Sequence, residues 1–249
     1  MEEQHRIYGL LGKDISYSFS PAYFKAKFER EGISNVDYLM FDEVDPFVFM
    51  AKANKMKGLE GFNITIPYKQ SLIPIFDSIS FEASEMLAVN CVKRNGSKWE
   101  GYNTDVYGFE YSLAPLLAAH HSKAVVLGTG GASRAVTFVL QKLGIAFLTV
   151  SRSKNKADLT YEQLSPAMIQ NFPIIINTTP LGTHPNIDQK PAIPYEALNE
   201  SHLLYDLVYN PAESAFLTAG KNQGAAIKNG LQMLELQAEK SWEIWNSVT

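Results

Sequence analysis

The chain has 249 residues, of which 46% are hydrophobic and 19% charged, with a formal net charge of -4 at pH 7. This length suits one large or two smaller globular domains, and the acidic balance argues against binding to nucleic acid or to an anionic membrane surface. No apolar run approaches the roughly 20 residues that cross a bilayer, and the N-terminal residues lack a signal-peptide pattern, so we expect a cytoplasmic protein.

Cysteine and histidine offer little chemistry. Cys91 is the single cysteine, and none of the five histidines forms a His-x-x-x-His or His-x-His pair. An intrachain disulfide and a cysteine zinc site are therefore excluded, and no metal site is predicted. We expect Cys91 to be buried and unreactive.

The chain begins with a predicted strand over 6–11, followed by a helix that ends near Gly32. Ser20 and Pro21 suit the start of this helix, because serine caps free N–H groups and proline is favoured at the first helical position. Ser18 and Ser20 also place two hydroxyls beside the positive end of a helix, which can hold a small carboxylate. These residues alone favour the cap as the role of Ser20.

A strand over 37–41 and a helix over 46–57 precede a strand over 61–66. Alternation places Asn63 and Thr65 on one face of this last strand, facing solvent, a partner or a cleft. Pro67 then looks like the first residue of a helix, with Lys69 in its first turn. The helix dipole disfavours an ammonium there, which suits a lysine that exchanges protons, although composition alone favours a solvated surface lysine.

Asn95-Gly96 predicts a hairpin between strands at 87–92 and 98–101. A helix running from Asp105 toward Ala119 follows. Asp105 is typical of an acid in the first turn of a helix. It also suits a carboxylate that enters the same cleft as Lys69.

The run 124–127 is apolar, stops at a glycine cluster and continues as a helix pattern. Gly128 and Gly130 permit a tight turn, and the N–H groups of the following helix attract an anion such as a dinucleotide pyrophosphate. Ser133 replaces the third glycine of the usual fingerprint, and such turns also occur for packing reasons.

The next strand, over 147–150, ends in Ser151-Arg152-Ser153-Lys154 rather than in the acid that binds the ribose of NAD. Arg152 can pair with a 2′-phosphate, so NADP is favoured over NAD. The segment 155–172 is short, which predicts a clipped crossover helix. Strands are expected over 173–176 and 203–208. A last helix from about Gly230 carries an apolar stripe of Leu231, Leu234, Ala238, Trp242 and Trp245.

Seven motifs in chain order resemble those of the shikimate dehydrogenase family, and together they span nearly the whole chain. They are Ser18-x-Ser20-Pro21, Asn63-x-Thr65-x-Pro67-x-Lys69, Ala88-Val89-Asn90, Gly101-x-Asn103-Thr104-Asp105, Gly128-x-Gly130-Gly131-Ala132-Ser133-Arg134, Asn177-Thr178-Thr179-Pro180-x-Gly182 and Asn229-Gly230-x-x-Met233-Leu234-x-x-Gln237.

The resemblance implies a two-domain α/β fold. A Rossmann-type NADP-binding domain would span 105–229, and an α/β substrate domain would comprise 1–104 and 230–249, completed by the C-terminal helix, with the catalytic cleft between the two. It also implies reversible, NADPH-dependent reduction of 3-dehydroshikimate to shikimate in chorismate and aromatic amino-acid biosynthesis. Monomer and homodimer both stay open.

The resemblance implies a role for each motif residue. Lys69 and Asp105 would be catalytic, with Lys69 exchanging the proton. The substrate would be held by Ser18, Ser20, Asn63, Thr65, Asn90, Asp105, Tyr209 and Gln237. NADP would be held by Gly128, Gly130, Gly131, Ala132, Ser133, Ser151, Arg152, Ser153, Thr178, Val208 and Gly230. An NAD-using quinate/shikimate dehydrogenase and a non-catalytic shikimate-sensing module are the alternatives.

Overall fold

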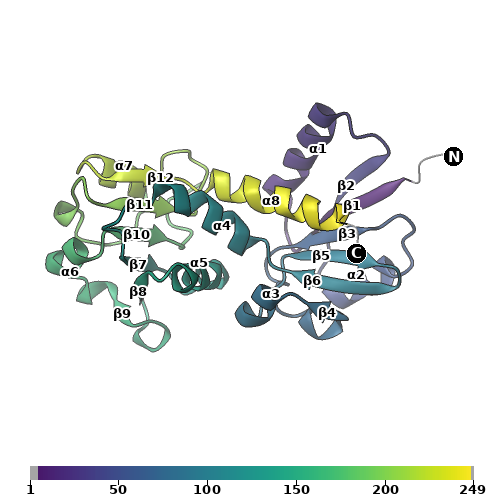
Figure 1. Cartoon of the computed structure of the whole chain (residues 1–249), viewed down its shortest axis with the longest axis horizontal. Coiled ribbons are helices and arrows are strands. Elements are labelled where there is room, and N and C mark those ends of the chain that lie inside the picture. The colour runs from purple at the N-terminus through teal and green to yellow at the C-terminus, as the bar shows by residue number, and fades with distance from the viewer. Residues whose placement is uncertain (1–4, 248–249) are drawn as a thin grey trace. The chain divides into compact units, whose positions relative to one another are not determined.

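The computed structural model describes residues 5–247 and divides into two compact units (Figure 1). Unit 1 contains residues 1–107 and 237–249, and unit 2 contains residues 108–236. Two helices cross from one unit into the other, α4 (Asp105–Leu113) and α8 (Leu231–Asn246). The C-terminal part of α8 thus completes the unit that the N-terminal residues begin.

Unit 1 is built on a six-stranded mixed sheet in the order β2-β1-β3-β5-β6-β4. Its strands are β1 (Arg6–Gly12), β2 (Val36–Asp42), β3 (Gly61–Ile64), β4 (Ser78–Ile79), β5 (Cys91–Asn95) and β6 (Lys98–Tyr102). Its other helices are α1 (Phe19–Glu31), α2 (Pro46–Ala53) and α3 (Phe81–Met86). β1 pairs in parallel with β2 and β3, and the predicted Asn95-Gly96 hairpin joins β5 to β6.

Alternation along the strands sends side chains to two separate cores in unit 1. Phe62 and Ile64 of β3 enter a core with Phe49 of α2. Tyr8 of β1 enters the other core, on the face that α1 and α8 cover. Asn63 lies between Phe62 and Ile64 and therefore points toward the α8 face.

Helix α8 is held in unit 1 by its aromatic residues. Trp245 stacks on Tyr8 with ring centroids 4.7 Å apart, and its indole N–H donates to the Val92 carbonyl at 2.9 Å. Ala238 and Trp245 are buried, which confirms part of the predicted apolar stripe. Leu231 is 37% exposed and does not belong to that stripe, because it lies in the first turn, away from this core.

Unit 2 is built on a six-stranded, wholly parallel sheet in the order β12-β11-β10-β7-β8-β9. Its strands are β7 (Lys123–Leu127), β8 (Ala146–Ser151), β9 (Leu159–Thr160), β10 (Ile174–Asn177), β11 (Leu203–Asp206) and β12 (Ala226–Lys228). Its other helices are α5 (Gly131–Lys142), α6 (Pro166–Asn171) and α7 (Ala215–Lys221). This order is that of a doubly wound, Rossmann-type sheet, with β7 and β10 meeting at the point where the order reverses.

Both faces of the unit 2 sheet are covered, as a parallel sheet requires. Ile169 of α6 and Phe216 of α7 belong to one buried cluster with Val125 of β7. On the other face, Phe109 of α4 packs against Tyr205 of β11 with ring centroids 5.1 Å apart. The predicted clipping of the crossover helix within 155–172 is confirmed, since the chain between β8 and β10 contains short 3-10 turns, β9 and only the six-residue helix α6.

Two predicted local features are wrong. The segment after β3 is a turn, not a helix beginning at Pro67, so Lys69 does not lie in the first turn of a helix. Ser20 is not the N-cap of α1, because the helix already begins at Phe19 with Ser18 in the capping position. Even Ser18 makes no side-chain capping bond.

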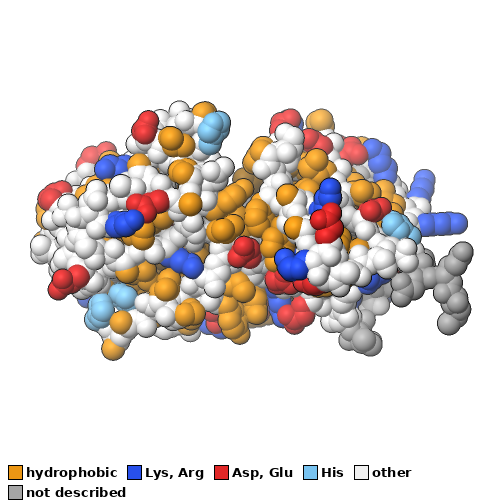
Figure 2. Space-filling view, turned by 90° about the horizontal axis from the view of Figure 1, so that it is seen from above, with side chains coloured by type: hydrophobic (Ala, Val, Ile, Leu, Met, Phe, Trp, Pro, Cys, Tyr) orange, Lys and Arg blue, Asp and Glu red, His pale blue; other side chains and the backbone are white. Residues whose placement is uncertain are grey.

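The surface shows no broad area of one charge on the face drawn in Figure 2, where acidic and basic side chains are interspersed. Among residues 5–247, no helix combines the length and the apolar character needed to cross a membrane.

Candidate functional site

Lys69 is held by the turn that follows β3. The buried Tyr68 anchors this turn, because its hydroxyl reaches the carbonyl oxygens of Glu43 and Val44 at 2.7 and 2.6 Å. The Val89 N–H donates to the Lys69 carbonyl at 2.7 Å. These backbone contacts, rather than a helix, determine where the Lys69 side chain begins.

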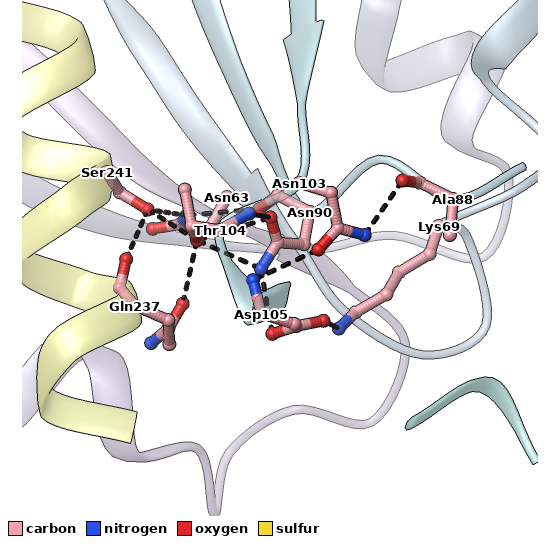
Figure 3. A network of polar contacts seen from close by, with 9 residues as sticks. All are labelled: Asn63, Lys69, Ala88, Asn90, Asn103, Thr104, Asp105, Gln237 and Ser241. Atoms are coloured by element: carbon pink, nitrogen blue, oxygen red, sulfur yellow. Dashed lines mark hydrogen bonds and ion pairs between the residues drawn. The ribbon is translucent and has the colours of Figure 1, made fainter. Parts of the chain in front are cut away.

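The Lys69 ammonium meets Asp105, whose Oδ2 lies 2.6 Å from Lys69 Nζ. The side chains of Lys69 and Asp105 are 30% and 18% exposed, so the pair is within reach of a ligand while staying partly shielded from water. Charge-assisted contacts of this length are among the stronger hydrogen bonds in proteins. The two predicted catalytic residues are therefore in direct contact, as Figure 3 shows.

Asp105 is oriented by neighbours on both sides. It is the first residue of α4, as predicted, and its backbone N–H donates to Asn103 Oδ1 at 3.0 Å. Its Oδ1 accepts from Asn90 Nδ2 at 2.9 Å. Asn90 Oδ1 in turn accepts from the Thr104 N–H at 2.7 Å. The carboxylate is thus fixed before any ligand arrives.

The protein itself occupies the side-chain amide of Asn63, as it does that of Asn90. Asn63 Nδ2 donates to Ser241 Oγ and to the Asn90 carbonyl, and its Oδ1 accepts from the Tyr38 hydroxyl at 2.9 Å. Asn63 is only 5% exposed. Its polar face therefore looks onto α8 rather than into an open cleft.

The remaining predicted substrate residues are distributed over both units. Thr65, Ser18 and Ser20 are half-buried, and Gln237 is buried, all in unit 1. Tyr209 is half-buried in unit 2.

Ser20 is bonded to the Tyr38 hydroxyl. Burial raises the pKa of Tyr38 well above its usual value, so this hydroxyl stays protonated. The same effect raises the pKa of Cys91 to about 12, and the thiol is fully buried, as predicted.

A cavity of about 780 Å³ lies at the carboxyl ends of β7, β8 and β10 in unit 2. Its lining contains six of the predicted cofactor residues, Gly128, Gly130, Ser151, Arg152, Ser153 and Thr178, together with Thr129, Lys156, Tyr161, Thr179, Pro180 and Leu181. Two cations and no carboxylate line it, which suits an anionic ligand.

The glycine-rich turn is built for close approach. Gly128 has a φ of +105°, and a Cβ there would lie 2.7 Å from Thr178 Oγ1, so a side chain is excluded. At Gly130 and Gly131 an added Cβ would meet nothing within 4 Å, which leaves open space beside the N-terminus of α5. Ser133 is buried, and its hydroxyl donates to the Gly130 carbonyl at 2.6 Å.

Five predicted cofactor residues lie outside the lining of this cavity, namely Gly131, Ala132, Ser133, Val208 and Gly230. Ala132 is exposed in the first turn of α5. Gly230 packs on the chain before it, since a Cβ there would lie 2.2 Å from the Leu207 carbonyl oxygen, and its N–H donates to the Val208 carbonyl at 3.2 Å. Close packing against Leu207 is thus the reason that position 230 requires glycine. Gly131 and Ser133 come after the lining residue Gly130 in the sequence and do not themselves line the cavity.

Several residues of both sites were given no role from the sequence, although Asn103 and Thr104 belong to one of the motifs. In unit 1 these are Tyr38, Asn103, Thr104 and Ser241, and in unit 2 Lys156 and Tyr161. Ser241 had a usable signal, because it follows Gln237 by four residues and so shares its helix face. No such signal was available for Tyr161, since its position at the cavity depends on the shortened crossover. Within residues 5–247, no three His, Cys, Asp or Glu side chains gather as a metal site.

The doubly wound sheet with its glycine-rich turn defines unit 2 as a domain of the dinucleotide-binding class. Residues 10–92 match the family model of the shikimate dehydrogenase substrate binding domain. The chain is 36% identical to a shikimate dehydrogenase (NADP(+)) from Methanococcus maripaludis, over 98% of this chain and 93% of that protein. The chain therefore belongs to the shikimate dehydrogenase family.

Solved structures agree with this assignment. A shikimate dehydrogenase from Aquifex aeolicus superposes with a TM-score of 0.84 at 32% identity, covering 99% of this chain and 94% of that one. A shikimate 5-dehydrogenase from Thermus thermophilus in complex with NADP(H) and shikimate has a TM-score of 0.85 at 26% identity, covering 98% and 94%. The two-domain fold with a Rossmann-type unit, expected from the motifs, is confirmed.

Proposed function

We propose that this chain catalyses the reversible, NADP-dependent oxidation of shikimate to 3-dehydroshikimate. The observation that carries the proposal is the Lys69–Asp105 contact of 2.6 Å, framed by Asn90 and Thr104 of the family's motifs. The relatives' names support the substrate and the cofactor.

Lys69 is the acid and base in this proposal. When the ketone is reduced, negative charge develops on its oxygen, and a positioned ammonium both stabilises that charge and delivers a proton. In the opposite direction the lysine accepts the hydroxyl proton. Asp105 holds Lys69 Nζ and keeps its remaining protons directed away from its own carboxylate, toward the ligand.

Recognition of shikimate would use two sets of residues. Its carboxylate would be held by Ser18, Ser20 and Tyr209, and its ring hydroxyls by Thr65, Asp105 and Gln237. The side-chain N–H groups of Asn63 and Asn90 are all occupied within the protein, so we assign both residues to support of the site rather than to direct substrate contact.

The unit 2 cavity fits a dinucleotide phosphate. Gly130 and Gly131 leave the space that a pyrophosphate requires beside a helix N-terminus, and Gly128 permits the turn that leads to them. Arg152, with Ser151, Ser153 and Lys156, offers donors where an NAD enzyme would present an acid. Thr178, Ala132, Ser133, Val208 and Gly230 complete the proposed cofactor set. When bound, NADP supplies the hydride acceptor.

The test is an assay of the purified chain with shikimate and with quinate, each combined with NADP and with NAD. The reaction is monitored by nicotinamide absorbance. Shikimate with NADP should react fastest. Faster reaction of quinate with NAD would instead identify a quinate/shikimate dehydrogenase. Calorimetric binding of shikimate with no absorbance change in any combination would identify a sensing module.

A further inference from the structure

Ser241 is a buried hydroxyl on α8 that contacts three separate segments of unit 1. Its side chain is fully inaccessible to solvent. Ser241 Oγ accepts from Asn63 Nδ2 at 2.9 Å and donates to the Gln237 carbonyl at 2.9 Å. Thr104 Oγ1 lies 3.3 Å away. One hydroxyl thus joins β3, the segment before α4, and α8.

The donors and acceptors around Ser241 can be assigned from its single proton. That proton goes to the Gln237 carbonyl, four residues earlier on the same helix. Ser241 Oγ accepts from Asn63 and also faces Thr104 Oγ1, whose proton has Ser241 Oγ, Asn90 Oδ1 at 3.3 Å and Gln237 Oε1 at 3.5 Å as acceptors. Both partners are almost fully buried, with Asn63 5% and Thr104 1% exposed, so neither has water as an alternative partner.

From Thr104 the contacts continue without a gap to the reacting amine. The Thr104 N–H donates to Asn90 Oδ1 at 2.7 Å, and Asn90 Nδ2 donates to Asp105 Oδ1 at 2.9 Å. Asp105 Oδ2 then holds Lys69 Nζ. Figure 3 shows this chain of side chains from Ser241 on α8 to Lys69. No charged group interrupts it before Asp105.

We propose that Ser241 is a positioning residue, whose hydroxyl locks Thr104 and Asn63 to α8 and thereby fixes Asn90 and the Asp105–Lys69 pair. The inference rests on the proposed function. Its physical basis is that a buried polar network specifies one arrangement only when every member is satisfied. Without the hydroxyl, Asn63 and Thr104 each lose a partner and gain freedom to move.

The main experiment compares Ser241→Ala with Ser112→Ala in the full chain. Ser112 is an equally buried serine, 1% exposed and bonded to the Tyr205 hydroxyl in unit 2. Because small misplacements of catalytic groups cost about 10²-fold in rate, Ser241→Ala should lower kcat for shikimate oxidation by about tenfold to a hundredfold. KM for NADP should stay unchanged, and the pH at half-maximal kcat should move in Ser241→Ala only.

Two variants of Thr104 test the same contact from the other side. Thr104→Val keeps the shape and removes the hydroxyl, whereas Thr104→Ser keeps the hydroxyl. Thr104→Val should lower kcat, and Thr104→Ser should retain most of it. Since both partners serve one contact, Ser241→Ala combined with Thr104→Val should lower kcat by less than the product of the single effects.

Three results would overturn the inference while the unmodified chain stays active. They are an unchanged kcat in Ser241→Ala, fully multiplicative losses in the double variant, and equal kcat losses with unmoved pH profiles in Ser241→Ala and Ser112→Ala. Absence of shikimate oxidation by the unmodified chain would instead overturn the proposed function, and the inference with it.

Discussion

At the scale of single residues, the chemistry of unit 1 depends on an amine and a carboxylate 2.6 Å apart. A lysine in a turn and an aspartate at the start of a helix are each unremarkable in sequence. Their contact arises because Asn90, just before β5, lies between the end of β3 and the β6–α4 connection and bonds to both Thr104 and Asp105.

Replacing Lys69 by alanine should lower kcat by at least about 10²-fold, the typical contribution of general acid–base catalysis. KM for shikimate should change little, because the hydroxyl and amide groups proposed to bind the substrate remain. Lys52→Ala is the matched control, since Lys52 is an exposed lysine of the same unit paired with Glu43. Steady-state kinetics of both variants decide the point, and near-normal turnover of Lys69→Ala would exclude its assigned role.

Arg152→Ala should weaken NADP binding by about tenfold to a hundredfold, because a charge-assisted hydrogen bond contributes roughly 1.5–3 kcal/mol. NAD, which lacks the 2′-phosphate, should bind as before. Lys154→Ala is the control, as Lys154 lies two residues away and outside the lining of the cavity. Calorimetric titrations with both cofactors provide the measurement. Equal weakening of NADP and NAD would show that the phosphate is bound elsewhere.

At the scale of elements, a buried carboxylate connects the ends of β10, β11 and α7. Asp206 is inaccessible to solvent and accepts from Asn177, from the Val208 N–H and from Ser214, the N-cap of α7. Desolvation raises the pKa of Asp206 to about 6, although these donors oppose the shift. The segment that carries Val208 and Tyr209 is therefore anchored on one titrating group.

This anchor should make stability fall as pH rises. A carboxyl whose pKa is raised by folding favours its protonated form in the folded state. The contribution of Asp206 to the free energy of unfolding is complete below about pH 4 and is lost as pH rises through about 6. The free energy of unfolding, relative to Asp206→Asn, should decrease by up to about 3 kcal/mol between these limits. Urea titrations across this range test the sign.

Asp158→Asn is the control for this pH effect. Hydrogen bonds from Thr149 lower the pKa of Asp158, so its contribution should be lost as pH falls, the opposite direction. A free energy of unfolding with the same pH dependence in both variants would show that neither carboxyl is responsible.

At the scale of the whole molecule, each unit has its own sheet and its own buried clusters. Substrate and cofactor are assigned to residues of different units, apart from Tyr209. Each ligand should therefore stabilise mainly the unit that binds it.

NADP at one hundred times its dissociation constant should add about 2.7 kcal/mol to the stability of the folded protein, and NAD at the same concentration less. Amide hydrogen exchange should show the protection from NADP chiefly over 123–134 and that from shikimate chiefly over 61–70 and 88–105. Protection by NADP confined to 61–105 would contradict the assignment of the cavity.

Local patterns predicted the strands and helices, the glycine-rich turn and the short crossover after β8, whereas the two-domain α/β fold with a Rossmann-type unit was implied by the resemblance of the motifs to a family. The local features depend on short-range patterns: apolar runs, glycine at turns and hydroxyls or acids at helix starts. The motif order added the pairing of Lys69 with Asp105.

Only the tertiary structure decided what the local patterns left open. Pro67 and Ser20 carried signals of a helix start, yet backbone carbonyls 25 residues earlier bind Tyr68 and hold the turn there, and Ser20 bonds to Tyr38. Ser241 reaches Asn63 across 178 residues of sequence. Long-range contacts of this kind follow from how strands and helices pack, because periodicity determines which face a side chain occupies but not which group it meets there.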